Sequence, residues 1–320
     1  MTVSNPVPII NLPLTVSRYR LHFIAQESLR LPAYAGSAWR GAFGRALRRL
    51  VCVTHEAHCP DCLLYRSCAY SYLFETPPDP AVPLLRKYPA APHPLLLRPP
   101  ADTGRSLAEG EETLLELTLF GQGHRYLPYV IHALDQAAAR GLGGQRGRLT
   151  LAAIEQQIKT DWMPIYRPGA ALTPRPGQIP EPPPCPERLI LRIETPLRLT
   201  ADNDHITPDA FRFTSLFGSL LRRISLLIAF HSDAPLSADF ATLARAADAI
   251  SLSAVRLRWR DWSRYSSRQR KSVPMGGLVG EIELNGGGLP PFWPWLWLGQ
   301  WTHAGKGTVM GLGGYRLEAQ

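Results

Sequence analysis

The spacing of apolar residues alternates along the chain between a period of two and a period near 3.6, which distinguish strands from helices. The first half predicts a strand over 12–25, a helix over 36–51, strands over 93–99 and 112–121, a helix over 127–141 and a strand over 147–157. Ser37 is a candidate N-cap of the first helix. The first half therefore has the order strand, helix, strand, strand, helix, strand.

The second half repeats this order with one extra helix. It predicts a strand over 188–200 broken by Pro196, helices over 209–231 and 237–251, strands over 254–262 and 277–286, a helix over 289–305 and a strand over 313–319. A duplicated β-α-β-β-α-β succession is the ferredoxin-like arrangement. The predicted fold class is therefore α+β, with two ferredoxin-like (RRM-like) domains in tandem.

A proline-rich segment separates the two halves. Its prolines are too dense for a helix or a central strand, so we expect an extended linker over 167–187. This boundary gives an N-terminal domain over 1–166 and a C-terminal domain over 188–320. The first contains a short cysteine-rich, metal-binding insertion over 52–75, and the second a glycine-rich loop over 304–314.

The charge of the chain narrows the class of partner. The formal net charge is +9 at pH 7, and arginine far outnumbers lysine. Guanidinium groups suit phosphate and base stacking, so a polyanionic partner is favoured over an ordinary basic surface. No signal peptide is recognisable, and the most apolar stretches, 216–230 and 289–301, are too short or carry arginines. We expect a cytoplasmic protein without a membrane partner, whose five cysteines are not in disulfides.

The stretch GKGTVMGLGGY, 305–315, holds five glycines and one lysine. It fails the P-loop pattern, because Gly307 stands where a magnesium-binding hydroxyl residue belongs, and it fails the dinucleotide spacing. Glycine lets phosphate approach backbone N–H groups, and Lys306 adds a charge. The alternative is a tight helix-to-strand turn. The candidate RNA contacts here are His303, Gly305, Lys306, Gly307, Gly311 and Gly313.

A second stretch, WRDWSRYSSRQRKS over 259–272, interleaves basic and aromatic residues. Cations neutralise a phosphate backbone and aromatic rings stack on exposed bases, a combination typical of RNA binding. The alternative is a solvated loop with core tryptophans. The candidate RNA contacts in this stretch are Arg264, Tyr265, Arg268, Gln269, Arg270 and Lys271.

Four cysteines within seventeen residues follow the pattern C-x6-C-x2-C-x5-C. Four thiolates are the usual complement of tetrahedral zinc, and a two-residue gap lets one turn supply two ligands. We predict a structural zinc site; the alternatives are free thiols, an iron–sulfur cluster, or replacement of one thiol by His55 or His58. Cys185 has no partner in the sequence. The candidate ligands are Cys52, Cys59, Cys62 and Cys68.

The succession RYSSRQ, GGLVGEIEL, an apolar helix and HAGKGTVMGLGGYRLE resembles the C-terminal half of CRISPR precursor-RNA-processing endoribonucleases of the RAMP superfamily. LPAYAGSAWRGAFGRALRR, followed by cysteines and LFE, is similar to members with a cysteine-bearing insertion in the first domain. The resemblance covers most of the chain. It implies two ferredoxin-like domains, repeat RNA or crRNA as partner, and association with other CRISPR effector subunits.

The resemblance also implies a reaction. RNA is cut without metal when its own 2′-hydroxyl attacks the adjacent phosphorus and leaves a 2′,3′-cyclic phosphate, which requires a base, an acid and a cation. Family members take a histidine from the opening helix region, helped by a tyrosine and a lysine or arginine. The helix 36–51 here has no histidine. The candidate catalytic residues are therefore Tyr34, before the helix, and His55, after it.

Other residues around this helix are further candidates. His22, His58 and His303 are further histidines that could act as a base, although a lone histidine is more often a packed residue. The arginines of the helix are candidate phosphate contacts, with a solvated basic face as the alternative. They are Arg40, Arg45, Arg48 and Arg49.

Three hypotheses of function follow. The first is a metal-independent endoribonuclease that processes precursor crRNA and retains the product. The second, favoured by the missing helix histidine, is a non-catalytic RAMP subunit that caps guide RNA in an effector complex. The third is a nucleotide-binding or unrelated enzyme.

Overall fold

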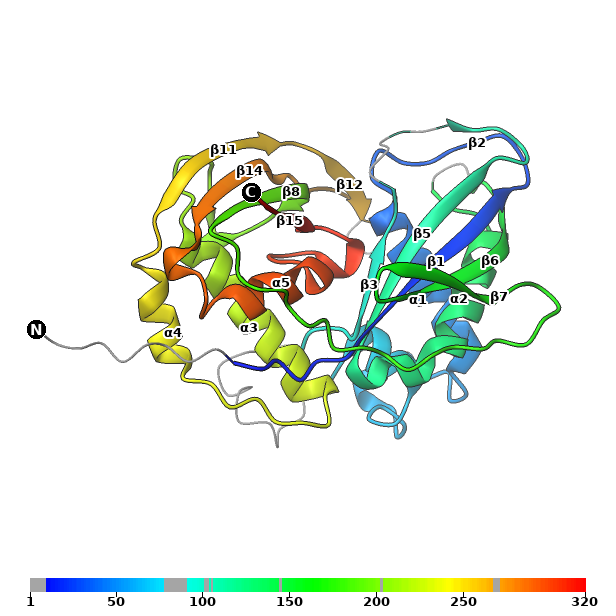
Figure 1. Ribbon diagram of the computed structural model, residues 1–320. Coiled ribbons are helices and arrows are strands. Elements are labelled where there is room, and N and C mark those ends of the chain that lie inside the picture. Colours follow the sequence, from blue (N-terminus) through cyan, green and yellow to red (C-terminus); the bar gives the residue numbers. More distant parts are fainter. Residues whose placement is uncertain are drawn as a thin grey trace, which may run out of the picture.

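The computed structural model describes residues 10–77, 91–100, 104, 106–143, 146–201, 204–266 and 271–320, with the backbone alone for 264–266 and 271–272. Two antiparallel sheets form its framework, one in each half of the chain (Figure 1). Their strand orders are β3-β5-β1-β6-β7 and β11-β14-β8-β15. This arrangement confirms the predicted α+β class.

The first sheet and its helices come from the N-terminal half. Its elements are β1 (Val16–Ala25), α1 (Gly36–Val51), β3 (Leu95–Arg98), β5 (Glu112–Phe120), α2 (Leu127–Ala139), β6 (Leu149–Ile158) and β7 (Asp161–Tyr166). A π-helical turn, η2 (Ser71–Glu75), follows the cysteine segment, and a 3-10 turn, η4 (Gly121–Tyr126), precedes α2. Short strands β2 (Leu29–Arg30) and β4 (Ser106–Leu107) pair with each other. The predicted succession is present, with β7 as an additional edge strand.

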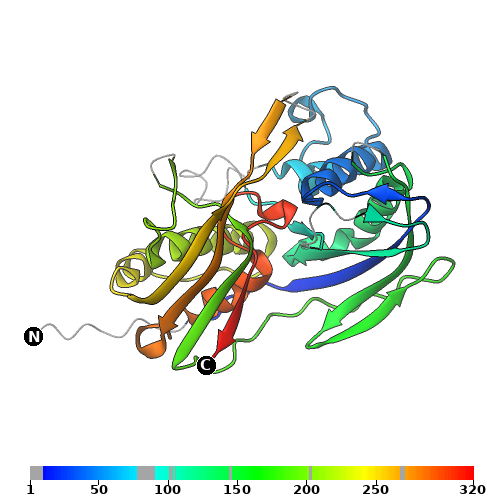
Figure 2. The ribbon, with the colours of Figure 1, turned by 90° about the horizontal axis from the view of Figure 1, so that it is seen from above.

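The second sheet comes from the C-terminal half. Its elements are β8 (Arg188–Leu197), β9 (Thr200–Ala201), β10 (Asp204–His205), α3 (Phe213–His231), α4 (Phe240–Ala247), β11 (Leu252–Arg260), β12 (Ser263–Ser266), β13 (Lys271–Pro274), β14 (Gly277–Asn285), α5 (Trp293–Thr302), η6 (Thr308–Met310) and β15 (Tyr315–Ala319). Strands β12 and β13 form a hairpin that reaches toward the N-terminal domain in Figure 2.

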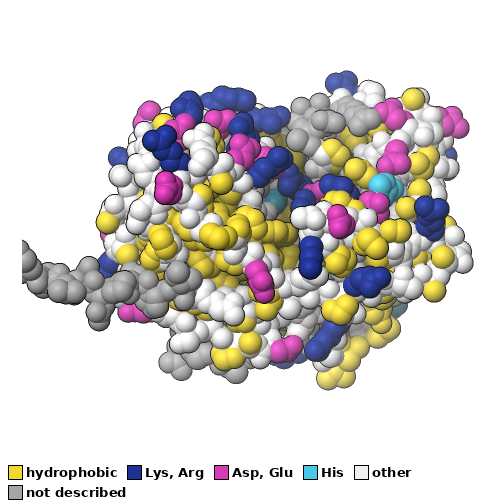
Figure 3. Space-filling view, in the orientation of Figure 1, with side chains coloured by type: hydrophobic (Ala, Val, Ile, Leu, Met, Phe, Trp, Pro, Cys, Tyr) yellow, Lys and Arg dark blue, Asp and Glu magenta, His cyan; other side chains and the backbone are white. Residues whose placement is uncertain are grey.

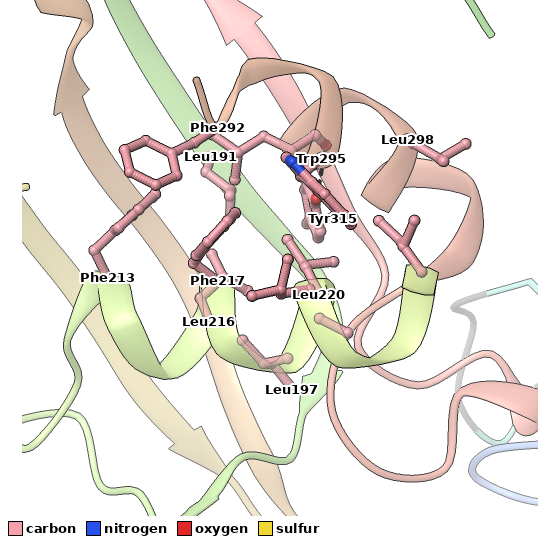
Figure 4. Packing of buried hydrophobic residues seen from close by; sticks show 14 of the residues in the cluster. Leu191, Leu197, Phe213, Leu216, Phe217, Leu220, Phe292, Trp295, Leu298 and Tyr315 are labelled. Atoms are coloured by element: carbon pink, nitrogen blue, oxygen red, sulfur yellow. Dashed lines mark hydrogen bonds between the residues drawn. The ribbon is translucent and has the colours of Figure 1, made fainter. Parts of the chain in front are cut away.

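Each sheet buries one face against helices. In β1 the side chains of Tyr19, Leu21 and Phe23 are fully buried, while the polar residues between them face the other side. In the C-terminal domain, Phe217 packs edge-on against Phe292 and Trp295, with ring centroids 4.7 and 6.3 Å away (Figure 4). Aromatic pairs in this arrangement add stability beyond the area that they bury.

One helix of the described residues, α3, has the length and apolar composition of a membrane span. However, 56% of its 18-residue apolar window is buried inside the protein, as in Figure 4, where its side chains point into the core. Core helices of globular domains have these same properties.

Two local expectations were wrong. Ser37 is not the N-cap of α1: the N-cap is Ala35, whose side chain makes no capping hydrogen bond. Pro196 does not break the strand, since β8 continues through it to Leu197. The proline-rich segment lies between β7 and β8 and also contacts the first sheet, because Gln178 pairs with Val16 and the Gln156 side chain bonds the backbone of Arg175.

Candidate functional site

The glycine-rich loop of the second domain contacts the start of α1 in the first. The Tyr34 hydroxyl donates to the Met310 carbonyl oxygen at 2.7 Å, and a Cβ on Gly36 would collide with that same oxygen. Gly311 lies directly against the Tyr34 hydroxyl. We call this contact of Tyr34, Gly36, Met310 and Gly311 the seam. The Tyr34 ring also packs on Trp262, with centroids 4.9 Å apart.

The glycines of this loop serve close packing and sharp turning. Gly305, Gly307, Gly311 and Gly313 all have φ between 70° and 85°, where residues with a Cβ are strained. The N–H of Gly305 donates to Ser219 Oγ, and that of Gly313 to the Pro196 carbonyl. These two donors are therefore not available to phosphate, and at these positions the structure supports the tight-turn alternative. The Lys306 side chain, in contrast, is exposed.

His303 does not reach the surface. It caps the end of α5 with φ 59°, is 2% exposed, and its Nδ1 lies 3.1 Å from the Leu312 carbonyl oxygen. Burial, with the Arg98 guanidinium, holds the pKa of this imidazole well below its ordinary value. The interpretation of His303 as an RNA contact therefore needs correction, because it lies beneath the loop as part of the scaffold.

Tyr34 and His55 do not form one site. They flank opposite ends of α1, whose 16 residues span about 24 Å. Tyr34 is mostly buried at the seam, and burial raises the pKa of its phenol, so it does not ionise near neutral pH. His55 is exposed in the cysteine segment, with φ 56°.

The arginines of α1 lie in three environments. Arg40 lies over the Phe74 ring, with its guanidinium carbon 4.3 Å from the centroid. Arg48 donates to the backbone carbonyls of Glu56 and Ala57 at 2.6 and 3.1 Å, so it holds the cysteine segment against the helix. Arg45 and Arg49 are exposed.

The basic and aromatic stretch forms part of the β12–β13 hairpin. Backbones of Arg264 and Tyr265 pair with those of Val273 and Ser272, and Lys271 pairs with Ser266. Arg268, Gln269 and Arg270 lie outside the described residues. At the base of the hairpin, the Trp262 ring contacts Tyr34 of the seam.

The four predicted zinc ligands line one small pocket after α1. Cys52, Cys59, Cys62 and Cys68 are all partly buried free thiols there. Within the part of the chain that the structure describes, no three His, Cys, Asp or Glu side chains converge closely enough to hold a metal ion. The donor chemistry thus fits zinc, while the side-chain positions do not form a complete site.

His22, a further candidate base, lies on β1, away from the cysteine segment. Its ring nitrogens bond the carboxylates of Glu112 and Glu155 at 2.8 and 3.0 Å.

A hollow of about 500 Å³ opens between the outer faces of the two sheets. Arg20 stacks on Trp162 at 3.8 Å, while Glu194 bonds Arg98 at 2.5 Å and Arg316 at 2.6 Å. Figure 3 shows Lys and Arg side chains along the upper edge of this face and into the hollow, with Asp and Glu among them. Cations here are therefore largely paired.

Sequence reasoning missed a further group on the helical side of the junction. His93 lies there beside η2 and near Arg40 and Arg223, which belong to α1 and α3. His93 begins a stretch predicted only as a strand, and Arg223 lies within a predicted helix, whereas Arg40 is already a candidate phosphate contact. The proximity of three segments so far apart in the chain gave no local signal.

Comparison with known proteins agrees with this architecture. Residues 12–178 match the family model AF_1859_N, described as an N-terminal domain, and residues 191–315 match that of the CRISPR-associated endoribonuclease Cas6. The chain is thus a protein of tandem ferredoxin-like domains closed by a C-terminal glycine-rich loop. Its N-terminal half belongs to the AF_1859_N family, and its C-terminal domain matches the Cas6 endoribonuclease family.

Individual relatives are distant. An uncharacterized protein of Archaeoglobus fulgidus is 30% identical over 132 residues, which are 41% of this chain and 43% of that protein. A solved Cas6 product complex is 18% identical with TM-score 0.57, covering 95% of this chain and 99% of the other. Thermus thermophilus Cas6 is 17% identical with TM-score 0.52 and the same coverage. A partial Cas6-RT-Cas1–Cas2 complex is 12% identical with TM-score 0.57, covering 98% of this chain and 47% of the other.

Proposed function

We propose that this protein binds CRISPR repeat RNA and cleaves precursor crRNA by attack of a ribose 2′-hydroxyl on the adjacent phosphorus, without a catalytic metal. The products would be a 2′,3′-cyclic phosphate and a 5′-hydroxyl. The observation that carries the proposal is the seam, because a domain of the Cas6 family places its glycine-rich loop against the start of α1. Arg40 and Lys306 lie near this junction as cations for phosphate.

A cleavage assay in EDTA tests the reaction. The purified full chain is incubated with its cognate repeat RNA and with the same RNA carrying one 2′-deoxy nucleotide at the cut. Cleavage of the ribose substrate alone is expected, since only that substrate has the attacking hydroxyl. Equal cleavage of both, or cleavage that requires added metal, would contradict the mechanism.

We also propose that the product stays bound and that other CRISPR effector subunits associate with the complex. The similar structures support this, because one is a Cas6 product complex and another is a partial Cas6-RT-Cas1–Cas2 complex. Labelled product should then remain with the protein through gel filtration. Release as fast as that of an unrelated RNA would contradict retention.

A non-catalytic RNA-capping subunit is the second candidate. The absence of histidine from α1 favours it, and so does the distance of His55 from the seam. Tight binding of both ribose and deoxy RNA without cleavage of either would establish this alternative.

A further inference from the structure

Five residues from four segments meet beside the seam, on the helical side of the junction. Arg40 of α1 lies over the Phe74 ring, and Phe74 stacks near His93, with centroids 6.4 Å apart at 19°. Thr76 bonds His93 at 2.7 Å, and Arg223 of α3 is near enough to lower the pKa of its imidazole. We call Arg40, Phe74, Thr76, His93 and Arg223 the His93 cluster.

The cluster borders the glycine-rich loop through both helices. Ser219, one helical turn before Arg223, accepts the N–H of Gly305. Gly36, one turn before Arg40, faces the Met310 carbonyl. One turn of helix advances about 5.4 Å. The cluster is therefore adjacent to the seam, whereas His55 lies at the far end of α1.

Hydrogen bonds assign the tautomer of His93. The Thr76 hydroxyl donates to the Tyr72 carbonyl oxygen at 3.0 Å, so its oxygen is left to accept from His93 Nδ1–H. The other ring nitrogen, Nε2, then carries the lone pair. A neutral imidazole oriented through Nδ1–H, with Nε2 available, is the form that takes a proton from a hydroxyl.

The backbone that presents Thr76 is strained. Thr76 has φ 47°, in the left-handed region that β-branched residues avoid, and it ends the π-helical turn η2. Its N–H bonds the Ser71 carbonyl at 2.6 Å, and Phe74 packs so closely against Gly44 of α1 that a Cβ there would collide with its ring. Strained residues and single π-helical turns are concentrated at functional sites, where neighbouring contacts hold them in place.

One guanidinium nitrogen of the cluster, on Arg223, has no hydrogen-bond acceptor among the described residues. Arg223 Nε donates to the Thr302 carbonyl at 2.6 Å, while its Nη2 is buried without any hydrogen-bond acceptor. Burial lowers the pKa of Arg223 to about 9. A buried guanidinium nitrogen without an acceptor is unfavourable, and a phosphate oxygen would satisfy it.

We propose that His93 is the general base of RNA cleavage, with Arg40 and Arg223 as the cations that hold the scissile phosphate. The proposal rests on the function proposed above. His93 Nε2 takes the proton of the 2′-hydroxyl, the 2′-oxygen bonds to phosphorus, and the bond from phosphorus to the 5′-oxygen breaks. Water supplies one proton to that oxygen. The imidazolium returns its proton to solvent, so atoms and charge balance.

The charges around His93 are those expected of a base whose pKa rises when the substrate binds. Burial lowers the pKa of His93 to about 3, helped by Arg40, Arg223 and His231. A phosphate between the two guanidinium groups offsets their positive charge and raises this pKa toward neutrality. The imidazole thus becomes an effective base only when RNA is bound.

Single-turnover cleavage of repeat RNA in EDTA tests the assignment. His93→Ala should lower the rate about 100-fold or more, the ordinary contribution of a general base. Binding of the 2′-deoxy RNA should change less than threefold. His93→Asn, whose amide can still donate to Thr76, keeps the local fold and should lose the same rate. His132→Ala, an exposed histidine on α2, is the matched control and should cleave as wild type.

Two further readouts separate chemistry from structure. Imidazole in the buffer should partly restore cleavage by His93→Gly, and the acid limb of the pH–rate profile should disappear in His93→Asn. Cleavage by His93→Asn within threefold of wild type would overturn the assignment while leaving the proposed function intact. A wild-type protein that binds RNA without cutting it would overturn both.

Discussion

At the scale of single residues, side chains at the domain junction are fixed by backbone atoms of the opposite domain. Tyr34 donates to the Met310 carbonyl, Ser232 to the Pro13 carbonyl, and His231 Nε2–H to the Pro92 carbonyl. Burial keeps the His231 imidazole neutral, because desolvation disfavours its charged form more strongly than the bond to the Pro92 carbonyl favours it. Histidine here therefore couples the junction to pH.

His231 should make the protein acid-sensitive. It is 1% exposed, and burial lowers its pKa to about 4 from 6.5. The unfolded chain then binds a proton that the folded chain does not, so stability is full above pH 6.5 and falls toward pH 4, by on the order of 3 kcal/mol. Urea unfolding at several pH values measures this loss.

His231→Gln should flatten that dependence, and the exposed His132→Gln should not. An identical pH slope in wild type and His231→Gln would show that His231 is not the source.

Removing the Tyr34 hydroxyl should weaken the seam. Tyr34→Phe leaves the buried Met310 carbonyl without its donor, a loss of about 1–3 kcal/mol in the free energy of unfolding. Urea denaturation measures it, with Tyr129→Phe, at an exposed tyrosine, as control. Equal stability of both variants would mean that water replaces the hydroxyl.

At the scale of elements, α1 connects two different environments. Its first turn meets η6 of the other domain, and its last turn holds the cysteine segment through Arg48. The helix has no side-chain N-cap and no acidic residue in its first turn. Its position thus depends on packing at both ends rather than on its own terminal signals.

Two glycines of α1 allow a matched test of this dependence. A Cβ on Gly36 would collide with the Met310 carbonyl, whereas one on Gly41 would meet only the Arg45 side chain of the same helix. Gly36→Ala should therefore lower stability by about 1–3 kcal/mol, and Gly41→Ala should raise it by up to about 1 kcal/mol. Thermal unfolding compares the two variants. A Gly36→Ala variant more stable than wild type would show that the Met310 carbonyl can move away from the new Cβ without loss of stability.

The cysteine segment should depend on a metal. It exposes Val53 and Leu63 by 73% and 95%, so it has few apolar contacts of its own, and a structural zinc would supply the missing stability. We propose one zinc per chain, lost on Cys59→Ser but kept in Cys185→Ser. Elemental analysis and protease sensitivity of this segment report the outcome. Iron in place of zinc, or a metal-free protein of unchanged protease resistance, would refute it.

At the scale of the whole molecule, RNA binding should draw on both domains through exposed cations. Lys306→Ala should weaken repeat-RNA binding and reduce the slope of log Kd against log salt by about 1, because one phosphate contact is lost. Arg245→Ala, on α4 away from the junction in Figure 1, is the control. Equal changes in both would assign the effect to net charge alone.

The sequence predicted what depends on neighbouring residues and missed what depends on distant ones. Alternation around Tyr19, Leu21 and Phe23 was enough for β1, since burial of one face requires it. The burial of His303 and the proximity of His93 to Arg223 follow from how the two domains pack. Neither has a local pattern, because residues more than a hundred positions apart create each environment.

The loop 305–314 belongs in sequence to the C-terminal domain but rests on β3 and α1 of the other. The junction is therefore built from residues of both domains. A chimera that joined this N-terminal half to the C-terminal half of a distant relative could keep both sheets and still lose the fit between them. Recombination that exchanges one half for that of a relative should therefore destabilise the protein, so we expect the two halves to be inherited together.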